Sequence, residues 1–226
     1  MKKILIITCS LLFARFTSAR DLSTMIQRET KDSLNYNWVQ NDKFPTFDVF
    51  IKFSDGALGD PKAIPGLTNA TFEGLTLGTP RFSKAEIQDS FDYFASSLNS
   101  SVYQEYSVLH LSGLQKDIIP TVKMLCHLLN QASYPEKEVN LYSNRMISGL
   151  QNLESSPAQL AERVHTALLY KNIHAAPYPT GTIQSLKKLS QKNLKSHLAH
   201  FIKSVEKNIY VVGNLEAYQT ITSIIK

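Results

Sequence analysis

Alternating apolar and polar residues mark the strands of this chain. Residues 47–53 (FDVFIKF) alternate and are rich in the aromatic and β-branched side chains that strands favour. Residues 208–213 (NIYVVG) form a similar run near the C-terminus, and residues 97–100 and 103–112 predict a pair of strands between the two. We expect all four segments to be strands.

Helical periodicity covers most of the remaining chain. Ser83 and Glu86 form a capping box, in which each side chain accepts a hydrogen bond from the backbone N–H of the other residue. Apolar stripes, capping residues and flanking prolines predict helices over residues 65–77, 83–94, 117–130, 135–153, 157–170, 190–204 and 215–225. Runs of strands and helices without strict alternation are typical of an α+β fold, in which helices cover one face of a sheet.

The helix over residues 65–77 is the most informative segment. It contains three threonines and Gly74, which are weak helix formers, so packing must hold it. It begins with Gly66-Leu67 and is followed by Gly78-Thr79. This frame resembles the first helix of the insulinase-like (M16) zinc peptidases, where a Gly-Leu start and a Gly-Thr finish bracket an inverted H-x-x-E-H zinc motif.

On that frame, the chemistry of the motif is lost. The first histidine falls at Asn69, the catalytic glutamate at Phe72 and the second histidine at Glu73. An amide is a poor zinc ligand, a phenyl ring accepts no proton, and one carboxylate does not supply three protein ligands. The family's further glutamate, about 75 residues downstream, falls in residues 145–150, which contain no acid. We therefore expect no catalytic residue, no metal site and no zinc cofactor.

Other features of the chain follow in the family's order. They are the 47–53 strand, the Ser83/Glu86 helix start, Leu98-Asn99, the 135–138 helix entry with Arg145, Ser156-Pro157, His174 with Pro177-Tyr178, Gly181-Thr182, Ser185-Leu186 and the 210–214 strand. The resemblance implies an α/β sandwich with a mostly antiparallel sheet covered by helices on one face. We assign residues 44–226 to an M16 peptidase-like domain and residues 20–43 to an N-terminal lead-in segment.

Residues 1–19 resemble a secretory signal peptide. Lys2 and Lys3 precede an apolar run of about ten residues, which is too short to span a bilayer, and Thr17-Ser18-Ala19 is a candidate cleavage site. Removal of this segment leaves 21 Lys and Arg against 19 Asp and Glu, a formal net charge of +2 in place of +5. So small an excess does not indicate a nucleic-acid-binding surface.

The number and positions of the cysteines agree with export of this protein. Cys9 leaves with the signal peptide, so Cys126 has no partner within the mature chain. Export without a disulfide framework is typical of a bacterial periplasmic protein of this size. The apolar fraction of 43% and charged fraction of 19% are those of a globular protein and exclude a disordered one.

The histidines of this chain provide few candidate metal-binding sites. His197 and His200 lie one helical turn apart and are candidate metal ligands, although histidines at this spacing are more often surface or half-buried residues without a metal. We expect His110 and His127 to be structural, and His165 to lie on a helix surface. His174 is expected to order the loop at residues 177–182.

Two aromatic-rich segments leave another alternative open. The aromatic residues of 44–53 and 103–106 either pack in the core or form a peptide-binding sheet face, as the family adds substrate to a sheet edge.

The resemblance also implies a function. M16 subunits normally contain two such domains, and many members pair a zinc-bearing subunit with a homologue that lacks the motif. We expect an exported, non-catalytic homologue that is a partner or scaffold for a zinc-bearing M16 subunit or a second M16-like domain, or that binds peptides. One alternative is a component of an active metalloendopeptidase complex whose zinc lies on another chain. Another is a decayed fragment.

Overall fold

The structure is a computed structural model, and it describes residues 26–31, 34–153, 156–169 and 178–225. The expected signal peptide and the role expected of His174 lie outside the described residues.

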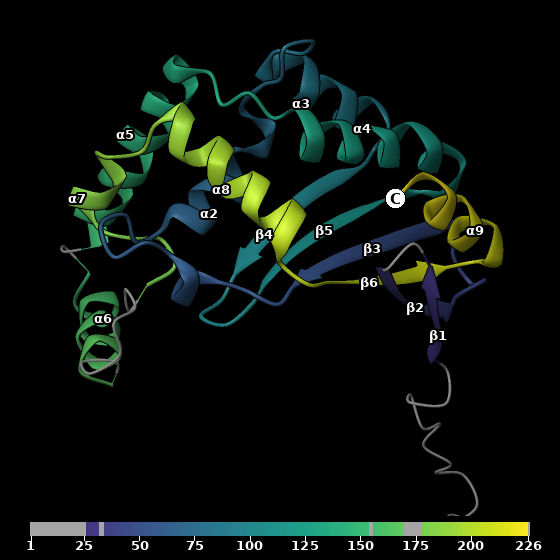
Figure 1. Ribbon diagram of the computed structural model, residues 1–226, viewed down its shortest axis with the longest axis horizontal. Coiled ribbons are helices and arrows are strands. Elements are labelled where there is room, and N and C mark those ends of the chain that lie inside the picture. Colours follow the sequence, from purple (N-terminus) through teal and green to yellow (C-terminus); the bar gives the residue numbers. More distant parts are fainter. Residues whose placement is uncertain (1–25, 32–33, 154–155, 170–177, 226) are drawn as a thin grey trace, which may run out of the picture.

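One six-stranded sheet organises the described chain (Figure 1). Its strands are β1 (Ile26–Lys31), β2 (Leu34–Gln40), β3 (Thr46–Phe53), β4 (Ser97–Val102), β5 (Ser107–Leu114) and β6 (Lys207–Gly213). Their order across the sheet is β1-β2-β6-β3-β5-β4, and every pair is antiparallel except β2 with β6. The prediction of a mostly antiparallel sheet is confirmed.

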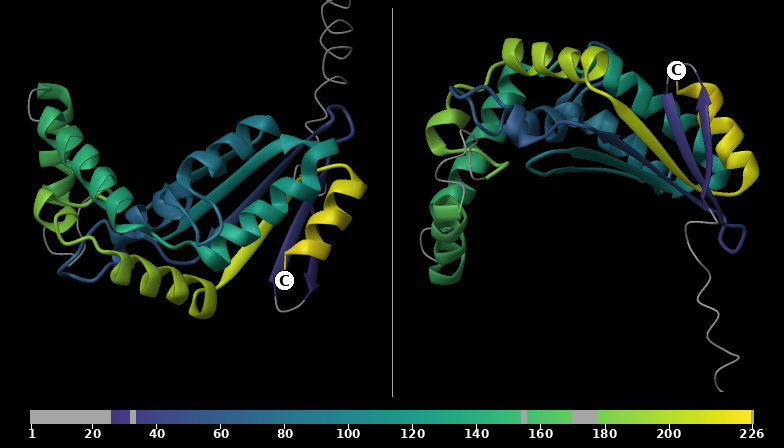
Figure 2. Two further views of the ribbon diagram at one scale, coloured as in Figure 1. Left: turned by 90° about the horizontal axis from the view of Figure 1, so that it is seen from above. Right: turned by 60° about the horizontal axis from the view of Figure 1, so that its bottom comes forward.

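Helices cover one face of this sheet, as expected. They are α2 (Leu67–Glu73), α3 (Lys84–Tyr93), α4 (Ile118–Gln131), α5 (Glu136–Leu153), α6 (Pro157–Leu169), α7 (Ile183–Leu186), α8 (Gln191–Ser204) and α9 (Leu215–Ile224), with short 3-10 turns at Ala57–Gly59, Gly74–Leu77 and Gln115–Asp117. Both views in Figure 2 show them on one side of the sheet only, with α6 projecting beyond the sheet. The predicted 65–77 helix is therefore α2 followed by a 3-10 turn.

The alternation of β3 explains which face is covered. Phe47, Val49, Ile51 and Phe53 are buried beneath the helices, because successive side chains of a strand point to opposite faces. Phe50 lies on the other face, where its ring stacks on His110 of β5 with ring centroids 4.2 Å apart.

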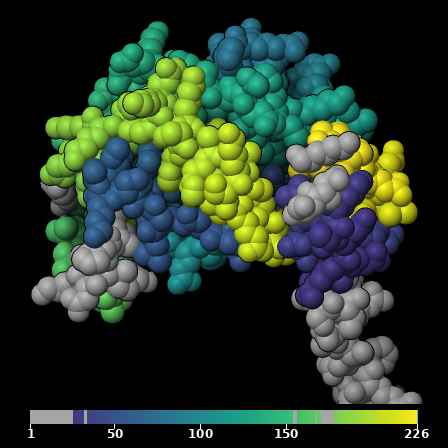
Figure 3. Space-filling view, viewed as in Figure 1, coloured from purple at the N-terminus to yellow at the C-terminus, as the bar shows by residue number. Residues whose placement is uncertain are grey.

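The first two strands are a difference from the sequence analysis. Ile26–Lys31 and Leu34–Gln40, within the segment assigned as a lead-in over residues 20–43, form two strands that the sequence analysis did not predict. Tyr36 and Trp38 are buried, and the Tyr36 hydroxyl donates to the Ile225 carbonyl oxygen at 2.8 Å. Figure 3 shows these N-terminal strands against the C-terminal segment. The asparagines of β2 hide its strand pattern, because Asn is depleted in strands.

No helix within the described ranges is long and apolar enough to cross a membrane.

Candidate functional site

The candidate site is built around α2, the helix with the altered zinc motif. Gly66 precedes α2 with a positive φ of 88°, a left-handed conformation that glycine adopts at little cost. A side chain there is also excluded by space, because a Cβ atom would lie 2.7 Å from the Cα atom of Gly181. The Gly-Leu start of the family frame is thus a requirement of the backbone.

Asp60 holds the N-terminus of α2. Its carboxylate accepts hydrogen bonds from the backbone N–H of Gly66 at 2.6 Å, and from the N–H and hydroxyl of Thr68 at 2.8 and 2.7 Å. These bonds satisfy donors that a helix start leaves without intrahelical partners. Burial raises the pKa of Asp60, and the hydrogen bonds from Thr68 and Gly66 oppose that shift. The sequence analysis did not single out Asp60, since nothing local connects it to a helix that begins seven residues later.

His197 of α8 extends this network. Its Nε2 atom lies 2.8 Å from the Thr68 hydroxyl oxygen and 3.7 Å from the Asp60 carboxylate. Because the Thr68 hydroxyl donates its proton to Asp60, the His197 Nε2–H must donate to Thr68. Burial, and secondarily His200, lowers the pKa of His197 to about 4, so the ring is neutral at neutral pH. Two consecutive buried hydrogen bonds, from His197 to Thr68 and from Thr68 to Asp60, therefore link α8 to the start of α2.

Phe72, at the position of the catalytic glutamate, belongs to the core. It is 2% exposed, and its ring packs against Phe53 of β3 and Phe201 of α8 with centroid separations of 5.0 Å each. These three rings fill the space where α2 crosses between the sheet and α8. Phe72 therefore supplies apolar packing at this position.

The other two motif positions meet at Tyr142 of α5. Asn69 is buried, and its side-chain amide donates to the Tyr142 hydroxyl at 3.5 Å. Glu73 is exposed and lies beside the same hydroxyl. Burial raises the pKa of Tyr142, and the Glu73 carboxylate adds to the shift. Asn69 and Glu73 thus lie together, and the group between them is the hydroxyl of Tyr142.

A basic residue occupies the place where the family's third ligand was sought. The Arg145 guanidinium lies 5.6 Å from the ring centroid of Tyr142, so α5 does bring residue 145 beside α2. Arg145 and Glu73 both line a cavity of about 370 Å³, together with Phe72, Thr76, Leu98, Asn99, Ser100 and Leu109. This cavity presents one guanidinium and one carboxylate beside the edge strand β4.

The described residues contain no group of three or more His, Cys, Asp and Glu side chains that could hold a metal ion. The ring centroids of His197 and His200 are 6.3 Å apart, and His197 Nε2 is engaged by Thr68. Catalytic zinc takes three protein ligands, so this pair does not complete a site with described residues.

The other histidines within the described residues have structural partners or are exposed. His110 Nε2 lies 2.7 Å from the Asp48 carboxylate on the uncovered face of the sheet. His127 Nε2 lies 3.1 Å from the Thr79 hydroxyl, just after α2 and its 3-10 turn. His165 is exposed on α6.

Known structures share the fold of this chain. The inactive domain of an M16 peptidase from Pseudomonas fluorescens superposes with a TM-score of 0.79 over 88% of this chain and 50% of that one, at 20% identity. The chain has the M16 peptidase fold. The periplasmic protease PqqL of Escherichia coli matches this M16-like chain with a TM-score of 0.78 at 12% identity, over 89% of this chain and 24% of PqqL.

Sequence comparison points the same way. The M16-like chain is 21% identical over 168 residues to the uncharacterized zinc protease YmxG of Bacillus subtilis. The matched part is 74% of this chain and 41% of YmxG, so the chain spans less than half the length of that relative. No protein-family model matches the chain.

Proposed function

We propose that this chain is an exported, non-catalytic M16-like domain that binds no zinc and acts as the partner of a second M16-like domain. The zinc-bearing subunit of a peptidase pair is the partner we favour. The observation that carries the proposal is that all three motif positions have changed while the helix that bears them is still held in the core.

Packing explains how the fold survives the loss of chemistry. The motif helix is buried over Leu67–Phe72, and its N-terminus is fixed by Asp60. These contacts do not require a metal ion. A domain with such a helix can still present the outer surfaces on which a paired domain depends.

The need for a partner is supported by length and by α6. The chain covers half of the Pseudomonas domain structure and 41% of YmxG, so each relative contains further chain of comparable size. On α6, Leu160, Val164 and Leu168 follow one another at four-residue spacing and are 43%, 52% and 65% exposed. Such a stripe on one helix face is typical of a surface that packs against another element.

A second candidate function is peptide binding, favoured by β4. This strand ends the sheet, pairing with β5 on one side and with no described strand on the other. Extended peptides add to such edges through backbone hydrogen bonds. The cavity lined by Arg145 and Glu73 lies beside it and includes Leu98, Asn99 and Ser100 of β4.

The first experiment separates the catalytic and non-catalytic hypotheses. The chain is purified after growth with zinc, and its metal content and hydrolysis of unstructured peptides are measured. We expect less than one zinc per chain and no cleavage above background. Stoichiometric zinc with cleavage that a chelator abolishes would overturn the proposal.

The second experiment tests pairing. The chain is co-expressed with a motif-bearing M16 homologue from the same genome, and the complex is sought by affinity purification and sedimentation. Val164→Glu with Leu168→Glu is expected to abolish the complex, since both side chains are exposed and the new charges require hydration. Gln159→Glu, on the same helix, is the matched control and should leave the complex intact. A chain that stays monomeric with every such homologue would contradict the pairing.

A further inference from the structure

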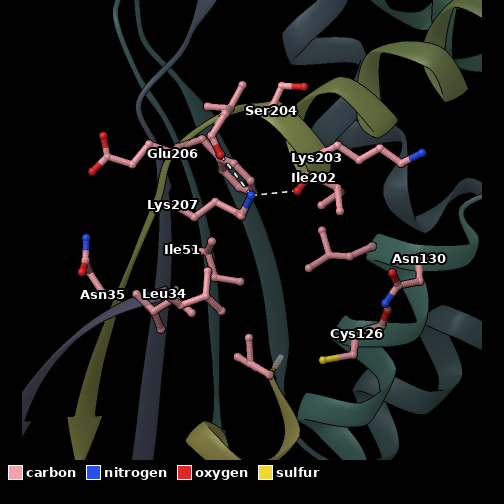
Figure 4. Close-up of a pocket in the computed structure, with 15 residues that line it drawn as sticks. Leu34, Asn35, Ile51, Cys126, Asn130, Ile202, Lys203, Ser204, Glu206 and Lys207 are labelled. Carbon is pink, nitrogen blue, oxygen red and sulfur yellow. Dashed lines mark hydrogen bonds between the residues drawn. The ribbon is translucent and has the colours of Figure 1, made fainter. Parts of the chain in front are cut away.

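A second cavity lies on the opposite side of α8 from the motif helix. It has a volume of about 500 Å³, within the range of ~300–1,000 Å³ typical of small-ligand sites. Its walls come from α4, the end of α8 and the sheet strands beneath them (Figure 4). None of its lining residues takes part in the site described above, except Phe53, which borders both.

The floor and two sides of this cavity are apolar, and polar side chains complete its lining. Ile51, Phe53 and Ile209 form its floor on the covered face of the sheet and are 3%, 0% and 1% exposed. Leu129 of α4 and Ile202 of α8 form the sides and are half-buried. A hydrocarbon group that enters this space covers the exposed parts of Leu129 and Ile202, which is favourable in proportion to the apolar area removed from water.

Two lysines, Lys203 and Lys207, line the cavity, and the ammonium of Lys207 is fixed by hydrogen bonds. The Lys207 ammonium donates to the carbonyl oxygens of Ile202 at 2.7 Å and Val205 at 3.0 Å, where α8 ends. Burial lowers the pKa of Lys207, and no described carboxylate forms an ion pair with it. The Glu206 carboxylate points away from the cavity and accepts a hydrogen bond from the Asn208 amide at 3.3 Å (Figure 4).

We propose that this cavity binds an amphipathic carboxylate with an unbranched alkyl chain, such as a medium-chain fatty acid. The alkyl chain lies between Leu129, Ile202 and the sheet floor, and the head group pairs with Lys207. A carboxylate is favoured over a neutral head group because the ammonium already has two neutral acceptors and lacks an anionic one among the described residues. This binding is independent of the proposed pairing with a second M16-like domain.

Cys126 gives the experiment its reporter. It lines the cavity, and Figure 4 shows its sulfur pointing into the space between α4 and the sheet. With Cys9 replaced by serine in the full chain, Cys126 is the sole thiol. Its reaction with a small neutral thiol reagent is followed at mildly alkaline pH with decanoate or decan-1-ol, both below the concentration at which they aggregate.

The expected result is protection that depends on the head group. Decanoate at ten times its dissociation constant should slow the reaction of Cys126 about 10-fold, and decan-1-ol should bind at least several-fold more weakly. Lys207→Gln should weaken decanoate while leaving decan-1-ol unchanged, which a merely structural effect of Lys207 would not do. Lys192→Gln, which changes an exposed cation of α8 that does not line the cavity, is the matched control and should change neither.

A filled cavity completes the design. Leu129→Trp places a larger side chain on the half-buried wall and should abolish protection by both ligands; if that variant loses its cooperative unfolding transition, Ile202→Phe replaces it. Equal protection by the acid and the alcohol would overturn the assignment of an anionic ligand. Absence of protection by decanoate in the parent protein would overturn the site itself.

Discussion

Two helices of this domain differ in what holds them. The motif helix α2 is buried over residues Leu67–Phe72, although its sequence is poor in helix formers. The projecting helix α6 has no buried residue among its described side chains, yet it carries exposed leucine and valine along one face. Tyr178 contacts it, with its hydroxyl donating to the Glu162 carbonyl oxygen at 3.0 Å and its ring 4.3 Å from the Arg163 guanidinium.

The comparison of α2 with α6 distinguishes a helix that packs in the core from a helix that presents an exposed apolar face. The α2 helix is buried over Leu67–Phe72, so packing in the core stabilises it without any zinc-binding side chain. The α6 helix has no buried residue among its described side chains, and its leucine and valine stripe is exposed, so little of its apolar face packs against the described residues. The altered zinc motif therefore lies on a helix held by the core, and the exposed apolar stripe lies on a different helix.

The largest expected effect comes from restoring the glutamate of the zinc motif. Phe72→Glu removes a ring packed between two others and buries a carboxylate, so the free energy of unfolding should fall by about 4 kcal/mol or more. Urea unfolding followed by circular dichroism measures this. The adjacent Glu73→His, at an exposed position, should change stability by less than ~1 kcal/mol. Equal stability of the two variants would show that α2 is not held by its core face.

The next effect is on pH dependence. The pKa of His197 is about 4 in the folded chain against 6.5 ordinarily, so the neutral ring stabilises the fold. This contribution is complete above pH 6.5 and is lost as the pH falls towards 4, which corresponds to about 3 kcal/mol. The raised pKa of Asp60 acts in the opposite sense, because its protonated form is favoured in the fold, and it offsets part of this loss.

Substitution of His197 separates its contribution to the pH dependence of stability from the contributions of other groups. His197→Gln keeps an amide that can donate to Thr68 but removes the titration, so stability should depend less on pH across this range. His165→Gln, on the exposed face of α6, should leave the wild-type dependence unchanged. Unfolding free energies measured across this pH range decide the matter, and an unchanged slope in His197→Gln would contradict a buried neutral ring.

Substitution of two glycines should change the free energy of unfolding by smaller amounts, and the two changes should be opposite in sign to each other. Gly66→Ala introduces a Cβ atom 2.7 Å from Gly181 at a left-handed position and should destabilise by about 2 kcal/mol. Gly149 lies inside α5, and a Cβ atom added there would meet no atom within 4 Å other than the adjacent backbone of its own helix. Gly149→Ala should therefore stabilise the fold by about 0.5–1 kcal/mol. Thermal unfolding of both variants tests this, and a neutral Gly66→Ala would show that the frame before α2 is less constrained.

The smallest effect on stability is expected at α6. Val164→Glu changes an exposed side chain, so the free energy of unfolding of the isolated chain should move by less than ~0.5 kcal/mol. Set beside the effect of Phe72→Glu, this measures the difference between the two helices. A loss above 2 kcal/mol would mean that the stripe packs within the chain, and the contrast would fail.

Much of this protein was accessible from local sequence. The β3 and β6 strands, the capping box of Ser83 and the long helices follow from periodicity and capping, because both depend on residues close in the chain. The altered motif at Asn69, Phe72 and Glu73 is likewise a local fact, since the chemistry of an amide, a phenyl ring and one carboxylate does not depend on folding. The α+β fold and the absence of a zinc motif could be predicted on these grounds.

Only the tertiary structure decided which distant residues meet. Thr68 and His197 are 129 positions apart, and β2 finds its parallel partner β6 near the other end of the chain. No local pattern encodes such pairs, because the free energy that brings them together comes from burying whole faces of the sheet and helices. The same holds for Arg145 beside Tyr142 and for the cavity between α4, α8 and the sheet. The sequence determined which chemistry was absent, and packing determined where the remaining groups were placed.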